Sequence, residues 1–558
     1  MSQRRHQTSF RFELLQADHD ERNFGPRLGR ATVQRAESDE PITLDVLTPG
    51  LIASTSRGLV PHMSRDSVDQ TAAIRWVHVP FESFLERLPP PPTLQPGDHP
   101  LHTYLGFRLQ KHIVTMTLRD PFDGREIPPN GKDFASAYCM RGVRKVKPED
   151  WRNYVLQCNP DVVVATTDIP FTPGNHSQKR TTKSIERSAA WLATLLQPIS
   201  ASVPYEDPSD SSAKDAPHLN VLVHMVGGAN SAARRAFSDT LLEPLYAKEA
   251  DAVKPFKTLD EGVAGYTFDL IPLHNALHAL KSEPTDPALP RALKTTITQL
   301  DPVPNIPSAE AIKQLPPLLQ ASLAPLPRTK PRFVHSAGSP HEILALIRDV
   351  GVDLFDAHWA QRAADVGIAL DFTFPAPEIT TSGDPAAAGG KSLGHNLYDT
   401  RYTHDFSPFA DAFHPDGEAT DPRPVCPCMA CSPVQPTTYI KHCTLDEPYP
   451  VRRSLPYTRA YLHHLLHTHE MSAHTLLAAH NLAVLDAFLA GVRAVIRRGA
   501  AEFAREVERF EAAYEAEMRV FGEAKRCWAE VEMARGKGRL TREKEKQEED
   551  TLGTAVEL

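Results

Sequence analysis

Three cysteines are crowded into six residues of this chain, in the stretch CPCMAC at 426–431. The spacing C-x-C-x-x-C lets three thiolates converge at about 2.3 Å on one zinc ion, and a structural zinc site takes four ligands. An iron–sulfur cluster could use the same thiolates, although it usually draws a fourth cysteine. Three free cysteines in a loop are the plainest alternative. The pattern therefore indicates a metal site whose last ligand lies elsewhere in the sequence.

The spacing leaves that fourth ligand open. Cys443 follows Cys431 by twelve residues and would complete a four-cysteine site. The imidazole nitrogen of histidine is also a zinc ligand. Six histidines downstream are candidates: His463, His464, His467, His469, His474 and His480. Residue type and interval do not choose between them.

Short apolar runs show which elements would position such a site. They predict buried parallel strands at 161–166, 220–226, 332–337 and 352–357. Helical patterning follows the first three runs, at 183–197, 232–246 and 339–351. The last of these helices opens with Ser339 and Glu342 at capping-box spacing. Alternating strands and helices imply a parallel sheet with helical crossovers, which either an open doubly wound sheet or a closed eight-stranded barrel would satisfy.

The sequence changes character from about residue 457, where a long helix-forming stretch begins. Beyond it an apolar residue recurs every three or four positions, which predicts one apolar stripe along a charged helix. The stripe consists of Phe503, Val507, Phe510, Tyr514, Met518 and Phe521. Such a helix either packs on its own domain or forms a coiled coil with a partner. The residues from 536 onward form a charged tail.

Composition limits the class of protein. The 558 residues carry a formal net charge of -9, so there is no overall basic signature of a nucleic-acid binder, although a local basic face remains compatible. The first residues hold no apolar stretch of signal-peptide length. No run of about 18 apolar residues occurs, which predicts no transmembrane segment. Seven cysteines, three of them crowded together, favour a reducing compartment, and we expect a cytoplasmic protein.

The metal region resembles a known family. CPCMAC followed by RAYLHHLLHTHEMSAHTLLAAHN is similar to the zinc region of the queuine/archaeosine tRNA-ribosyltransferases, which carry CxCxxC, SRAYLHHL and a helix ending in HN. The resemblance implies that His480, 21 residues after Arg459, is the fourth ligand. Cys443 then lies in an insertion and is a bystander. The implied site is Cys426, Cys428, Cys431 and His480, holding one structural zinc whose loss would unfold its subdomain.

The resemblance extends over most of the chain. LDVLTPGLIASTSRGLVPHMSRD (44–66), KSIERSAAWL (183–192) and KPRFVHSAGSPHEILALIRDVGVDLFDAHWAQR (330–362) are similar to family segments. It implies a (β/α)8 TIM-type barrel with a zinc-binding insertion and a C-terminal helical extension. We expect the barrel at 1–420, the zinc-binding subdomain at 421–482 and a helical region with a charged tail at 483–558. Proline-rich insertions would interrupt the barrel near 282–331 and 374–425.

Family enzymes exchange guanine in the tRNA anticodon for a deazaguanine base. An aspartate attacks the ribose C1′ in a nucleophilic mechanism. The nucleophile position falls on Asp356, in a pattern that includes Asp353 and Arg362. Ala360 and Gln361 replace a Pro-Thr pair of the family, so the local turn differs.

The residues that hold the base are altered. No DSGG occurs, and IRWVHVPFESF (74–84) occupies that region. The family glutamine of VQGG is replaced by Val226, and bulky residues of DLIPLHN (269–275) stand in the place of GGLAVGE. The base-reading aspartate aligns with Thr167, one residue before Asp168. Each missing buried hydrogen bond costs about 1–3 kcal/mol, so base binding should fail.

The resemblance is therefore to non-catalytic members of the family, which pair with a catalytic subunit in a heterodimer. Such a chain would bind tRNA and support tRNA-guanine transglycosylation, the exchange of guanine for queuine at the wobble position, without catalysing it. An active transferase using Asp356 and a zinc-stabilised barrel with another role are the alternatives. Basic residues at 179–187 and 141–147 are candidates for phosphate contacts, or else solvated charged faces.

Overall fold

The computed structural model describes most of the chain in ten stretches. They are residues 8–17, 24–36, 40–125, 127–169, 176–199, 217–281, 309–377, 390–414, 423–433 and 455–534. Cys443, the predicted charged tail from 536 and parts of the two proline-rich insertions, at 282–308, 378–389 and 415–422, lie outside these stretches.

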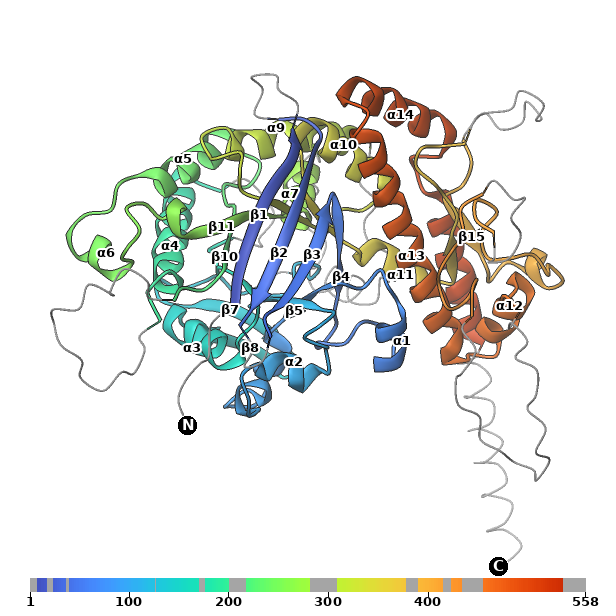
Figure 1. Ribbon diagram of the computed structural model, residues 1–558, viewed down its shortest axis with the longest axis horizontal. Coiled ribbons are helices and arrows are strands. Elements are labelled where there is room, and N and C mark those ends of the chain that lie inside the picture. The colour runs from blue at the N-terminus through green and yellow to red at the C-terminus, as the bar shows by residue number, and fades with distance from the viewer. Residues whose placement is uncertain are drawn as a thin grey trace, which may run out of the picture.

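Eight parallel strands close into a barrel (Figure 1). In barrel order they are β4 (Gly50–Ser54), β5 (Trp76–Pro80), β6 (Ile113–Thr117), β9 (Val162–Val164), β10 (Val221–His224), β11 (Val263–Asp269), β12 (Arg332–His335) and β13 (Leu354–Asp356). The barrel closes where β13 pairs with β4, with Leu354 opposite Gly50 and Asp356 opposite Ile52. The prediction of a closed barrel is confirmed, and so are the four strands expected from apolar runs, because a strand covered on both faces is apolar throughout.

Helices surround the barrel and connect its strands. They are α1 (Arg65–Gln70), α2 (Pro100–Leu105), α3 (Pro148–Cys158), α4 (Gln178–Leu195), α5 (Ser231–Leu242), α6 (Ala247–Ala252), α7 (Leu270–Lys281), α9 (Ala309–Leu323), α10 (Pro340–Val350) and α11 (His358–Asp365). At the start of α10 the Ser339 hydroxyl accepts the Glu342 N–H at 3.1 Å, as predicted. The Glu342 carboxylate instead accepts the Gly338 N–H at 2.7 Å, one residue before the expected partner.

An antiparallel sheet lies across one end of the barrel, as Figure 1 shows. Its strands are β1 (Thr8–Ala17), β2 (Arg27–Arg35) and β3 (Ile42–Thr48). Apolar residues of this sheet join Trp76 and Phe333 from the barrel strands in one buried cluster. Two buried arginines of β2 bind aspartates at the amino ends of barrel strands, Arg35 with Asp161 and Arg27 with Asp353. Asp353, part of the nucleophile pattern in the sequence, is therefore a structural anchor.

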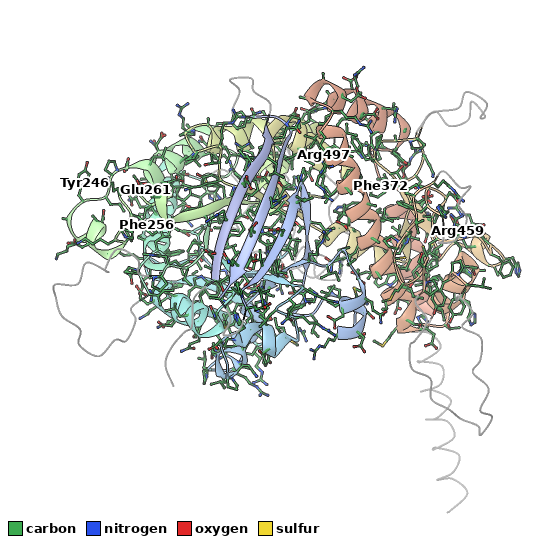
Figure 2. The ribbon with its side chains drawn as sticks, in the orientation of Figure 1. Tyr246, Phe256, Glu261, Phe372, Arg459 and Arg497 are labelled. Carbon is green, nitrogen blue, oxygen red and sulfur yellow. The ribbon has the colours of Figure 1, made fainter. Side chains whose placement is uncertain are left out.

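A helical region follows the barrel and contains α12 (Arg459–His467), α13 (Met471–Ile496) and α14 (Ala500–Ala513). Two short strands pair beside it, β14 (Ile368–Leu370) with β15 (Gly394–Asn396). Phe372, labelled in Figure 2, contacts aromatic rings of this region, with its centroid 5.4 Å from that of Phe488 and 6.3 Å from that of Phe510. The six residues of the predicted stripe are all buried, so the stripe packs within its own chain.

Two boundaries of the predicted division need correction. Helix α13 runs without interruption through the expected border between 482 and 483, so His480, the predicted zinc ligand, and the C-terminal region share one helix. The insertion expected at 282–331 includes α9, whose Leu315 and Leu319 are buried against the barrel. Prolines 316 and 317 lie inside this helix, and their helix-breaking tendency made the segment read as a loop.

Helix α13 is long and apolar enough, by length and composition, to cross a membrane. Its most apolar window is 67% buried inside the protein. Since the core helix of a folded domain passes the same test, this is weak evidence for a membrane span.

Candidate metal centre and barrel mouth

The three cysteines and His480 converge on one point. The Nδ1 atom of His480 lies 3.6 Å from the sulfurs of Cys426 and Cys428 and 3.5 Å from that of Cys431. In a tetrahedral zinc site, sulfur and nitrogen ligands are about 3.5 Å apart, as follows from bonds of about 2.3 and 2.0 Å. All four side chains are buried. The group therefore fits a four-coordinate metal ion closed to solvent.

His480 is oriented by β14. Its Nε2 lies 2.9 Å from the Leu370 carbonyl oxygen, which can only accept a hydrogen bond, so Nε2 carries the proton and Nδ1 faces the thiols. The next residue, Asn481, accepts the Leu370 N–H at 2.9 Å and donates to the carbonyls of Ile368 and Ala360 at 3.0 and 3.1 Å. Both residues of the HN pair thus fasten α13 to β14.

Backbone and hydroxyl contacts fix the cysteine loop. The Ser432 N–H donates to the Cys428 carbonyl at 2.8 Å, and its hydroxyl donates to the Cys426 carbonyl at 2.9 Å. The Tyr457 N–H donates to the Ala430 carbonyl at 2.9 Å, which joins the loop to the segment before α12. These hydrogen bonds hold the three cysteine side chains on the same side of the loop as His480.

Next to this centre is a second group of possible ligands, Asp371, His395 and Asp411. Two cations already occupy it: Lys391 lies 3.2 Å from Asp371, and Arg459 lies 2.7 Å from Asp411 and 2.9 Å from His395. These charges make it an ion-pair network that holds α12 in place. Figure 2 shows Arg459 beside the helical region, away from the barrel.

Asp356, which the resemblance aligns with the nucleophile, ends β13 and is fully buried. Its carboxylate accepts the N–H groups of Ser336 and His358, the latter at 2.8 Å. The segment after β6 covers both neighbours: the Ser336 hydroxyl donates to the Pro121 carbonyl at 3.1 Å, and Phe122 stacks on His358 with centroids 3.8 Å apart. A ribose carbon has no path to this carboxylate in the arrangement described.

Four polar residues that the sequence analysis missed line the mouth of the barrel, by which we mean the pocket at the carboxyl ends of its strands. Asp120 follows β6, and His224, Asp269 and His335 are the last residues of β10, β11 and β12. Active sites of such barrels lie at the carboxyl ends of the strands, so a polar residue in that position was the available signal. It could be used only once the strand ends were known.

Burial dominates the electrostatics of the mouth. It raises the pKa of Asp269 to about 8, helped by the nearby charges of Asp356 and Asp120. Burial also raises the pKa of Asp120 and of Asp356 to about 7, although backbone N–H groups lower each value in part. The same burial lowers the pKa of His335 to about 4, so this ring is neutral at physiological pH. Around neutrality the pocket therefore carries the Arg119 guanidinium, whose pKa burial lowers only to about 10, beside partly protonated carboxyls and a neutral His335.

Residues that the resemblance aligns with the base-holding positions are apolar in this chain. Val226 and Leu270 are buried, and Pro272 lines the pocket. The remaining cavity measures about 50 Å³, room for only a few water molecules. From its sequence, the segment 74–84 is expected to stand in place of the DSGG loop. This segment forms β5 and the residues after it. The pocket is lined instead by residues 117–121, at the end of β6 and just after it.

Asp168 cannot replace the base-reading aspartate. Arg180 of α4 binds both its carboxylate oxygens at 2.7 and 2.8 Å, and Arg187 binds it at 3.0 Å. Asn130 donates a further hydrogen bond at 2.9 Å. The carboxylate is fully buried and its acceptor sites are used. Arg180 and Arg187, two of the basic residues at 179–187, therefore form ion pairs with Asp168 of the same chain.

Comparisons with known proteins agree with this geometry. The family model described as Queuine tRNA-ribosyltransferase matches residues 302–516. A Drosophila persimilis protein named Queuine tRNA-ribosyltransferase accessory subunit 2 is 24% identical over 454 residues, 81% of this chain and 83% of that protein. Proteins of the same name from Xenopus tropicalis and Schizosaccharomyces pombe are each 24% identical, over 85% and 84% of this chain and 94% and 78% of their own lengths.

The matched residues include Asp356 and all four metal-ligand candidates. The relatives align along most of the chain, and the closed barrel is the fold that the resemblance implied. The chain is thus similar to queuine tRNA-ribosyltransferases, by the family model over residues 302–516 and by its alignment with the accessory subunits along most of its length.

Proposed function

We propose that this chain is the non-catalytic accessory subunit of a heterodimeric queuine tRNA-ribosyltransferase. It binds the catalytic subunit and tRNA, and so supports the exchange of guanine for queuine at the anticodon wobble position. Alone it does not carry out the reaction. Relatives that align along most of this chain carry the name accessory subunit 2, which supports this assignment.

The state of the barrel mouth carries the proposal. Asp356 is fully buried and bonded to two main-chain N–H groups, and the cavity beside it holds only about 50 Å³. Val226, which the resemblance aligns with the family glutamine, is a buried apolar residue and offers no hydrogen bond to a base, and Pro272 lines the cavity. A polar ligand group left unpaired in a buried site costs about 1–3 kcal/mol, and several such losses remove specific binding.

Retention of Asp356 keeps an active transferase as the second candidate. A carboxylate attacks ribose only when it is ionised. Burial raises the pKa of Asp356 to about 7, so a large share of it is protonated near neutrality. This candidate therefore needs both opening of the mouth and ionisation of the side chain.

The ion at the metal centre is, in our proposal, one Zn²⁺ per chain. Three thiolates and one imidazole in tetrahedral arrangement are a typical structural zinc site, in which no position is left for a substrate. Thiolate ligation is preserved in a reducing compartment, which is consistent with our proposal of a cytoplasmic protein.

The partner surface that we propose lies around α12. Phe406, Leu455, Tyr457 and Tyr461 are exposed large apolar residues there, and the rings of Tyr457 and Tyr461 stack with centroids 5.6 Å apart. Hydrogen bonds from the first residues of α12 to Asp405 and Ser407 bring Phe406 beside it. Exposed aromatic residues near one another are typical of protein interfaces. The occupant we assign is the catalytic subunit.

The deciding experiment measures incorporation of labelled guanine or queuine into a cognate tRNA. We expect none from this chain alone and strong incorporation when it is mixed with the catalytic subunit. The Asp356→Ala variant should support the partner as well as the wild type does. Incorporation by the chain alone, abolished by Asp356→Ala, would instead establish the active transferase.

A further inference from the structure

The connection between β6 and α3 contains a hairpin, β7 (Ala135–Cys139) and β8 (Gly142–Val146), which pair in antiparallel register. Because β6 ends at the carboxyl face of the barrel, the hairpin emerges at the mouth. Ala135 at its base lines the mouth pocket. Any RNA presented to this face of the barrel would meet the hairpin.

The hairpin is anchored to the barrel through its backbone. The buried Glu82 carboxylate accepts the Tyr138 N–H at 2.8 Å and the Asp120 N–H at 2.9 Å. The guanidinium of Arg119 donates to the Ser136 carbonyl at 2.5 Å. At the turn, the Met140 N–H donates to the Glu86 carboxylate at 3.1 Å. The tip is therefore held in a fixed place and presents its side chains without a large ordering cost.

The tip is strongly basic. Within RGVRKVK (141–147) there are four cations and no acid, in a chain whose net charge is -9. Arg141, Arg144, Lys145 and Lys147 are all exposed. In the part of the chain that the structure describes, no ion pair includes any of these four. Free, exposed cations on a fixed arm are available to phosphates.

Two cation–ring contacts lie at the hairpin, and one of the tip cations, Lys145, makes one of them. The Lys145 ammonium lies 4.7 Å from the centroid of Phe134, and the Arg125 guanidinium lies 4.3 Å from that of Tyr138. Basic side chains interleaved with aromatic faces are typical of RNA-binding surfaces, where phosphates pair with cations and unstacked bases pack on rings. The α4 candidates differ, because Arg180 and Arg187 are bound to Asp168.

We propose that the β7–β8 hairpin is a phosphate-binding arm of this subunit for the tRNA on which the catalytic subunit acts. The proposal rests on the accessory-subunit function and adds the surface through which this chain holds RNA. Its cations contact the backbone and carry no sequence specificity of their own. The arm contributes tRNA affinity and leaves the base exchange to the partner.

The test uses the assembled heterodimer with the double variant Arg141→Ala, Arg144→Ala. The matched control is Arg497→Ala, Arg498→Ala, which removes the same charge from exposed arginines at the end of α13. Arg497 lies near the antiparallel sheet at the opposite end of the barrel, where the Gln16 side chain donates to the Ile496 carbonyl at 3.3 Å (Figure 2). Binding of labelled cognate tRNA is measured by fluorescence anisotropy at several salt concentrations.

We expect the hairpin variant to weaken tRNA binding about tenfold or more and to reduce the slope of log Kd against log salt by about 1.5, the value for two lost phosphate contacts. The KM for tRNA should rise, while kcat and the KM for queuine stay unchanged. The control should bind as the wild type does. Equal affinity and slope for the hairpin variant and the control would overturn the proposal.

The same experiment distinguishes failure of the hairpin proposal from failure of the accessory function, and RNA binding from membrane binding. Failure of the wild-type chain to assemble with, or to stimulate, the catalytic subunit overturns the accessory function itself and not the hairpin's affinity for RNA. Vesicles containing phosphatidylserine test an anionic membrane as the alternative occupant. Loss of vesicle binding in the hairpin variant, with tRNA affinity unchanged, would assign the arm to lipid headgroups and overturn our proposal.

Discussion

The acidic side chains at the barrel mouth illustrate how surroundings decide what a residue does. Asp356 keeps the position of a nucleophile, but two main-chain N–H groups and the segment after β6 enclose it. Asp120 and Asp269 lie in the same mouth, and burial raises the pKa of each, to about 7 and about 8. Such carboxyls hold protons that a solvated carboxyl would release. Their protonation near neutrality therefore follows from burial in the mouth.

This protonation predicts a pH-dependent stability. The folded pKa of Asp269 is raised to about 8. In the unfolded chain Asp269 releases its proton near pH 4, whereas in the folded protein it keeps the proton up to about pH 8. Its contribution to the free energy of unfolding is therefore fully present at low pH and is lost as the pH rises through 8. We expect Asp269→Asn, which mimics the protonated form, to lose less stability than the wild type between pH 7 and 8.5. The difference should approach 1.4 kcal/mol per pH unit at most.

Urea denaturation at fixed zinc, followed at pH 7 and pH 8.5, measures this difference. The control is Asp239→Asn, an exposed aspartate of α5. The buried histidines of the mouth do not contribute to the difference between pH 7 and 8.5. The pKa of His335 is lowered, so its ring is neutral in the folded state above pH 7. A histidine in the unfolded chain is mostly neutral in this pH range as well. Identical slopes for Asp269→Asn and Asp239→Asn would contradict the raised pKa of Asp269.

The sequence specified some residues of the two sites and not others. The cysteine triplet was evident from spacing, and resemblance was needed to choose His480 among six histidines, because its partners lie on β14, 110 residues away. At the mouth, Asp356 was found by its motif. Asp120 and His335 have no local motif, and their proximity depends on which strands are neighbours in the closed barrel.

At the scale of elements, α13 joins the metal centre to the rest of the protein. It carries His480 and Asn481, both bonded to β14, and Arg493 near its end donates to the Pro49 carbonyl at 2.6 Å. Arg75 of the barrel pairs with Asp486 of the same helix. An ion at His480 therefore stabilises a helix that also contacts the barrel.

Removal of the metal ligand should unfold this region. We expect His480→Ala to reduce bound zinc from one per chain to nearly none and to expose the segments around 423–433 and 455–470 to protease. Structural zinc supplies on the order of 10 kcal/mol to small folded sites, so several kcal/mol of stability should be lost. His464→Ala, an exposed histidine of α12, is the control and should keep its zinc. Elemental analysis and limited proteolysis measure both effects, and a zinc-replete His480→Ala protein would exclude His480 as a ligand.

Helix boundaries show where local sequence was insufficient. The stretch from 457 read as one long helix, but α12 ends before His469, whose φ of 59° is left-handed, and α13 begins at Met471. There is no glycine or proline at this break. The turn is held by tertiary contacts, among them the Tyr398 carbonyl 3.1 Å from His467, which no local pattern could reveal.

At the scale of the whole molecule, two surfaces of different chemistry lie on different parts of the structure, and we assign them to different partners. The basic hairpin stands at the barrel mouth, and the apolar group Phe406, Leu455, Tyr457 and Tyr461 lies around α12 beside the metal centre. Figure 1 shows β7 and β8 on the barrel and α12 at the far edge of the helical region. The two can be altered independently.

The apolar surface predicts a selective loss of assembly. We expect Tyr461→Glu to weaken association with the catalytic subunit by at least tenfold, because it places a charge in an interface core. The melting temperature of the isolated chain should not change, since Tyr461 is 44% exposed. Tyr246→Glu, at a residue 73% exposed beside α6 (Figure 2), is the control. Light scattering after gel filtration measures the complex, and normal assembly of Tyr461→Glu would place the interface elsewhere.

The closure of the barrel has a consequence for synthesis of the chain. Strand β4, made early, finds its partner β13 only after about three hundred further residues, and α13 reaches Pro49 later still. Until then the nascent polypeptide presents an unpaired, apolar strand edge, which is prone to aggregation. Completion of the fold therefore waits for the last third of translation, and a ribosome stalled before residue 354 leaves a product that chaperones or proteases must handle.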